Sequence, residues 1–163
     1  MPTELLKPFD EKKGWGGPVA FSPDGKRALV SQYFYGANKE PTSRLVLCKA
    51  SSGEQIWDSS TSAQAGGFTA DGKEVFGWQP DNTLCFWDVT SGKKVKSFLL
   101  DPGKPNPKNR FRRQVVRTVS SEGGLALTAI GENEFRYGVD IKIKVWDLHK
   151  GKLLHTWADP SRP

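Results

Sequence analysis

A sixteen-residue pattern occurs three times in this chain, as RLVLCKASSGEQIWDS (44–59), TLCFWDVTSGKKVKSF (83–98) and KIKVWDLHKGKLLHTW (142–157). Glycine occupies the tenth place of every copy, and an aliphatic residue follows three places later. A second pattern precedes each copy, as AFSPDGKRALVSQ (20–32), GFTADGKEVFGWQ (67–79) and TVSSEGGLALTAI (118–130). Such recurrence is typical of one supersecondary unit that stacks on copies of itself, because a single unit cannot bury its apolar faces.

Turn signals divide each unit into four short segments. Glycine accepts the positive φ that tight hairpin turns require, and every unit contains two such glycines. Apolar residues alternate or run briefly between the turns, and no segment carries a sustained 3.6-residue period. The sequence therefore predicts an all-β protein whose units each contain four antiparallel strands. The turn glycines are Gly25 and Gly53, Gly72 and Gly92, and Gly123 and Gly151.

This organisation resembles the WD-repeat β-propeller family, over about residues 5–158. Trp-Asp ends the third strand of the second and third units, and an Asp six residues earlier matches the family's turn aspartate. The resemblance implies that residues 1–163 form one propeller segment with three blades, at about 14–60, 61–100 and 112–158. The matching residues, expected to be structural, are Asp81, Trp87, Asp88, Asp140, Trp146 and Asp147.

The first unit departs from the family pattern. Cys48-Lys49 fills its dipeptide position, whereas Trp57-Asp58 falls in the fourth strand. The family's Gly-His pair is absent from all three units, so its polar side-chain network is incomplete and we expect apolar packing to dominate. The repeat predicts no role for Trp15, Trp57 or Trp78.

The N-terminal segment TELLKPFD (3–10) aligns with GKLLHTWA (151–158) and predicts an extra outer strand. Three whole blades are fewer than the four to eight of a closed propeller. Three interpretations stay open: a fragment of a longer propeller, a half-propeller that dimerises into a six-bladed ring, and a self-contained short stack.

Unusually long connections indicate where a partner would bind. The two turn glycines of a unit are 28 residues apart in the first and third units and 20 apart in the second. The extra residues lie near 33–43 and 131–140, and a third insertion lies near 101–113. The resemblance places all three on one face, where insertions indicate a binding surface. Tyrosine and arginine are enriched at interface hot spots. The candidate binding residues are therefore Tyr33, Phe34, Tyr35, Arg110, Phe111, Arg112, Arg113, Phe135, Arg136 and Tyr137, with neutral loop decoration as the alternative.

Basic charge is concentrated in one segment. The chain has a net charge of +6, and residues 101–117 hold six basic residues and one acidic one. The basic inter-blade loop at 101–111 thus predicts, as a second function, contact with a polyanion or nucleic acid through 104–117. A solvated linker is the simpler interpretation.

The remaining features favour a non-catalytic protein–protein interaction or scaffold module. No nucleophile–base set, phosphate loop or paired-cysteine zinc motif occurs, so neither enzyme activity nor a metal or cofactor is expected. A third possibility is part of an enzymatic propeller whose remaining blades are missing. Cys48 and Cys85 are expected to be buried, reduced thiols. The N-terminus has no signal segment and no run is long enough to span a membrane, which predicts a cytoplasmic protein.

Overall fold

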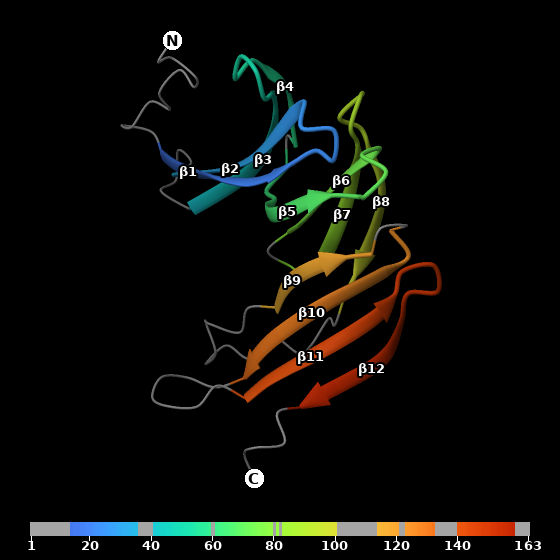
Figure 1. The fold of residues 1–163 in the computed structure, drawn as a ribbon. Coiled ribbons are helices and arrows are strands. Elements are labelled where there is room, and N and C mark those ends of the chain that lie inside the picture. The colour runs from blue at the N-terminus through green and yellow to red at the C-terminus, as the bar shows by residue number, and fades with distance from the viewer. Residues whose placement is uncertain are drawn as a thin grey trace.

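The described residues form four-stranded antiparallel sheets and the turns that join their strands (Figure 1). The computed structural model describes residues 14–35, 41–59, 61–79, 81, 83–100, 114–120, 123–132 and 140–158. These residues contain twelve strands in three sheets and no helix. The prediction of an all-β chain with four strands per unit is confirmed. The predicted extra strand at 3–10 and the basic loop at 101–111 lie outside the described residues.

Each sheet is a continuous stretch of sequence whose strands pair in chain order. The first sheet contains β1 (Gly14–Phe21), β2 (Arg27–Tyr35), β3 (Pro41–Lys49) and β4 (Gln55–Asp58). The second contains β5 (Gln64–Phe68), β6 (Glu74–Trp78), β7 (Thr83–Asp88) and β8 (Lys94–Leu99). The third contains β9 (Gln114–Val119), β10 (Leu125–Glu132), β11 (Asp140–Asp147) and β12 (Lys152–Ala158).

The predicted turn glycines all adopt positive φ, between 60° and 69°. Side-chain hydrogen bonds stabilise the first hairpin turn of the first and second sheets. In the β1–β2 turn, the Ser22 hydroxyl donates to Asp24 Oδ1 at 2.6 Å, and the same oxygen accepts the Lys26 backbone N–H at 3.0 Å. Thr69, Asp71 and Lys73 repeat this arrangement between β5 and β6. The turns are thus fixed by residues within a few positions of one another.

Two apolar layers hold the three sheets together. We call the side of a sheet that points toward the next sheet along the chain its forward face, and the opposite side its rear face. The forward face of the first sheet packs on the rear face of the second through Leu29, Leu45, Leu47, Val75, Cys85 and Trp87. The forward face of the second packs on the rear face of the third through Phe76, Leu84, Phe86, Ala126 and Trp146. Each fully buried large side chain contributes about 1.5–3 kcal/mol, so these layers are the main source of stability.

The Trp-Asp pairs serve two separate purposes. Both indole rings lie between sheets, and Trp146 Nε1 donates a buried 3.0 Å hydrogen bond to Thr128 Oγ1. The aspartates face the following turns: Asp88 Oδ1 accepts the Ser91 N–H at 2.7 Å, and Asp147 Oδ1 accepts the His149 N–H at 2.9 Å. The tryptophan therefore stabilises the layer and the aspartate orders the hairpin.

Candidate binding face

The extra residues of the first and third units lengthen the middle strands of their sheets. The β2–β3 ladder continues to the pair Tyr35 and Pro41, and the β10–β11 ladder continues to Glu132 and Asp140. In the second sheet, by contrast, β6 contains five residues and β7 six, against nine each for β2 and β3. The first and third sheets therefore carry longer two-stranded ribbons.

This arrangement corrects the expectation that residues 33–35 belong to an inserted loop. All three lie in β2, where they pair with Ser43, Thr42 and Pro41. Continued pairing satisfies the backbone N–H and C=O groups that a loop would leave to water. Tyrosine and phenylalanine also favour strands, so the same residues that suggested a binding loop extend the ladder.

Strand direction places the long ribbons at a common end of the sheets. We call this the insertion end; it holds the ends of the even-numbered strands and the starts of the odd-numbered strands. A short connection shows that the first and second sheets share this end, since β4 ends at Asp58 and β5 begins at Gln64. In Figure 1, β1, β5 and β9 begin on the left and β10 ends there. Of the predicted binding residues, Tyr33, Phe34 and Tyr35 lie at this end.

The other predicted binding residues lie outside the described part of the chain: Arg110, Phe111, Arg112, Arg113, Phe135, Arg136 and Tyr137. Of the segment 104–117 predicted to contact a polyanion, the structure describes the backbone of 114–117 at the start of β9. Tyr33 is partly buried and pairs with Trp15 of β1. The structure thus brings one aromatic run to the insertion end, and the polyanion contact stays a prediction.

A polar bridge that sequence reasoning missed crosses the rear face of the first sheet. Arg44 Nε donates to Gln32 Oε1 at 2.7 Å, and Arg44 Nη1 donates to Asp58 Oδ2 at 2.9 Å. Gln32 belongs to β2, Arg44 to β3 and Asp58 to β4, so the bridge spans three strands. A signal existed in the repeat, since an arginine opens the first sixteen-residue copy and an aspartate stands at its fifteenth place.

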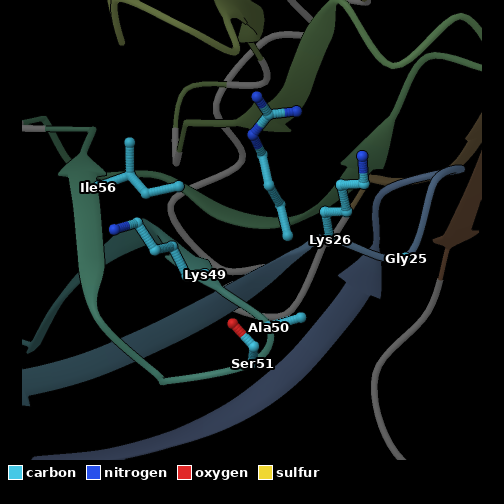
Figure 2. A pocket seen from close by; sticks show the side chains of 7 residues that line it. Gly25, Lys26, Lys49, Ala50, Ser51 and Ile56 are labelled. Atoms are coloured by element: carbon cyan, nitrogen blue, oxygen red, sulfur yellow. The ribbon is translucent and has the colours of Figure 1, made fainter.

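The opposite end of the first sheet has a shallow hollow of about 640 Å³ between its two hairpin turns (Figure 2). Lys49 Nζ lies 2.7 Å from Glu54 Oε2, which offsets part of the positive charge. Both of these side chains are more than half exposed, so this ion pair contributes little to the stability of the fold. The hollow is lined by Gly25, Lys26, Arg27, Lys49, Ala50, Ser51 and Ile56.

The described residues contain little reactive chemistry. No group of three or more His, Cys, Asp or Glu among them could hold a metal ion. Burial raises the pKa of the Cys48 and Cys85 thiols, which keeps them protonated and weakly nucleophilic. His149 lies in the β11–β12 turn, and His155 lies in β12 with its ring 5.8 Å from that of Trp157. Over the same residues, no helix has the length and apolar character needed to cross a membrane.

Comparison with known proteins adds no relative. The sequence matches no family model and no curated protein.

Proposed function

We propose that this chain is a non-catalytic protein-interaction module that binds a protein partner through its insertion end. The observation that carries the proposal is the lengthened β2–β3 ribbon, which holds Tyr33, Phe34 and Tyr35 in a paired strand. The backbone of a paired strand is already ordered before a partner binds. Binding there therefore costs little backbone entropy, and more of the contact energy remains as affinity. Tyrosine adds a large contact area with few rotatable bonds.

We further propose that the three sheets are WD-repeat-like propeller blades. Support comes from the four-stranded sheets, from Trp87-Asp88 and Trp146-Asp147 at the ends of β7 and β11, and from the Trp146–Thr128 hydrogen bond. Stacked sheets that repeat one unit expose their connections at two ends. In such an array a binding surface at the connections leaves the apolar layers undisturbed.

Affinity purification from source cells, followed by quantitative mass spectrometry, tests the interaction proposal. The test variant combines Tyr35→Ala, Arg112→Ala and Tyr137→Ala. The control variant carries three alanine substitutions at the opposite end, at Lys26, Lys49 and Lys73, which are exposed. We expect one or more proteins recovered with the wild type to be lost with the test variant and kept with the control. Equal recovery with both variants would overturn the proposal.

A further inference from the structure

The forward face of the third sheet carries residues that are wholly buried at the equivalent places of the other sheets. Ile143 occupies the same place in the repeat as Leu84 and Leu45. Leu84 and Leu45 are each 0% exposed, because the next sheet covers them, whereas Ile143 is 37% exposed. No described sheet packs on this face. Among the described residues, it therefore has the composition of an inter-sheet contact with no sheet opposite it.

Several neighbouring side chains make this face continuous across three strands. Ile143 of β11 pairs with Trp157 of β12, and Val145 of β11 pairs with both Leu127 of β10 and His155 of β12. Trp157 is 53% exposed, although its equivalent in the second sheet, Phe98, packs against the buried cluster there. We call Leu127, Ile143, Val145 and Trp157 the open patch. A solvent-exposed apolar patch of this kind is typical of a contact surface.

The rear face of the first sheet differs from the open patch, because its apolar side chains in β2 and β3 are buried. On the rear face of the first sheet, Val46 is 2% exposed, and Val30 and Cys48 are also buried. Val46 pairs directly with Asp58, one terminus of the Arg44 bridge. Terminal repeats of stacked proteins need a polar outer surface for solubility. The Arg44 bridge supplies one at the first sheet, and the described residues around the open patch form no equivalent bridge.

We propose that the open patch binds the open patch of a second copy of this chain, in a two-fold symmetric dimer. The alternative, head-to-tail stacking, would press the open patch onto the rear face of another copy's first sheet. That contact would remove water from the Arg44–Asp58 pair, whose side chains are 38% and 24% exposed, and desolvating an ion pair is costly. Patch-on-patch contact avoids this cost and is the commonest symmetry among oligomers.

Charge within the open patch does not oppose self-contact. Its four residues are uncharged, and the titratable side chain that shares this face is His155, which pairs with Val145 and lies beside Trp157. Lys144 belongs to the rear face, beside the ring of Trp146 at 5.8 Å. In the resulting dimer the six described sheets would form one stack, with an Arg44 bridge on the rear face of each copy's first sheet. The open patch shares no residue with the predicted binding residues, so the dimer and the proposed partner interaction are tested with different variants.

Sedimentation equilibrium of the purified chain over a wide concentration range tests the dimer. We expect a concentration-dependent dimer for the wild type. Ile143→Glu would place two carboxylates in the contact, and Trp157→Ser would remove its largest side chain. Loss of a hot-spot side chain weakens association about 30-fold. Trp157→Ser, on an exposed edge strand, keeps the test informative if Ile143→Glu fails to fold. Val95→Ser is the control, since Val95 is similarly exposed at the edge of the second sheet.

Two outcomes separate the competing arrangements. Phe21, at 68% exposed, lies on the rear side of the first sheet, opposite Ala28, so Phe21→Ser should leave a patch-on-patch dimer unchanged and weaken a head-to-tail one. An Ile143→Cys variant places a thiol within the contact, so a patch-on-patch dimer whose two-fold axis passes beside Ile143 should form an intermolecular disulfide on mild oxidation, while buried Cys48 and Cys85 stay unreactive. A chain that remains monomeric at every concentration, or a dimer sensitive to Phe21→Ser, would overturn the proposal.

Discussion

Trp57 of the first sheet donates a hydrogen bond from its indole Nε1 to the backbone carbonyl oxygen of Val89, at 3.0 Å. The two residues are 32 positions apart: Trp57 belongs to the first sheet, and Val89 directly follows β7 of the second. Trp57 lies in β4, the fourth strand, and its ring also packs against the β7–β8 turn at Gly92. A residue without a counterpart in the other units therefore connects the first sheet to the second.

Replacing Trp57 should measure this connection. Trp57→Phe keeps an aromatic ring but leaves the Val89 carbonyl without its donor, and we expect it to lower the free energy of unfolding by about 1–2 kcal/mol. Trp57→Ala should cost about 3 kcal/mol or more. Urea denaturation followed by far-UV circular dichroism gives the values. Ile56→Ala, at the neighbouring exposed position, is the control, and a cost equal to that of Trp57→Phe would contradict the bridging role.

Two turn glycines with the same backbone conformation should respond differently to alanine. Gly25 and Gly92 have φ of 69° and 68°, so alanine at either position costs about 1–2 kcal/mol of backbone strain. A Cβ at Gly25 would meet nothing within 4 Å, whereas at Gly92 it would lie 2.8 Å from Trp57 Cγ.

We therefore expect Gly92→Ala to be more destabilising than Gly25→Ala, by about 1 kcal/mol or more. Thermal melts of the two variants give the comparison. In a Trp57→Ala background the difference should shrink, because the clashing ring is gone; an unchanged difference would point to strain alone.

The buried pair of Trp146 and Thr128 predicts a hydrogen-bond effect inside the second apolar layer. Thr128 is fully buried and its hydroxyl accepts the indole N–H. Thr128→Val keeps the side-chain shape but leaves that N–H unpaired, which should cost about 1–3 kcal/mol. Thr128→Ser retains the acceptor and loses a methyl group, so it is the matched control. Equal stability of the valine variant and the wild type, measured by chemical denaturation, would show that the bond contributes nothing.

Turn carboxylates predict how stability depends on pH. Hydrogen bonds from Ser22, Thr69 and Ser91 hold the pKa of Asp24, Asp71 and Asp88 below the ordinary value of 3.8. A carboxyl whose folded pKa is lowered contributes stability above its unfolded pKa, and this contribution is lost as the pH falls through the folded value.

The melting temperature should therefore be level above about pH 5 and fall from about pH 4 downward. Thr69→Ala removes the strongest cause of the Asp71 shift and should flatten part of this acid decline. Thr118→Ala is the control, because its hydroxyl contacts no carboxylate among the described residues. If the melting temperatures of the wild type, Thr69→Ala and Thr118→Ala fall in parallel with decreasing pH, the turn carboxylates do not cause the acid decline.

The two cysteines should be protected by the fold. Burial raises the pKa of both thiols, and the thiolate is the reactive form. A chromogenic thiol reagent at neutral pH should label the native protein far more slowly than the unfolded one, with both thiols reacting in denaturant. Rapid labelling of native Cys85 would contradict its place in the first apolar layer, where it is fully buried.

The sequence alone predicted the units of this fold. The turn glycines at 25, 53, 72, 92, 123 and 151 and the alternation between them specify hairpins through contacts a few residues apart, and such local rules can be applied to a bare sequence. The same rules placed Trp57-Asp58 in a fourth strand. These rules failed for residues 33–35. An aromatic run between a strand and a turn is compatible with either a loop or a longer ladder, and the pairing with residues 41–43 shows that it extends the ladder.

The tertiary structure decided which faces are covered. Leu45, Leu84 and Ile143 are equivalent in the repeat, yet the first two are buried and the third is exposed, since burial depends on whether another sheet lies opposite. The Trp57–Val89 bond and the Arg44 bridge join residues 32, 12 and 14 positions apart. Local chemistry therefore determined the strands and turns, while long-range packing determined the candidate binding face and the open patch.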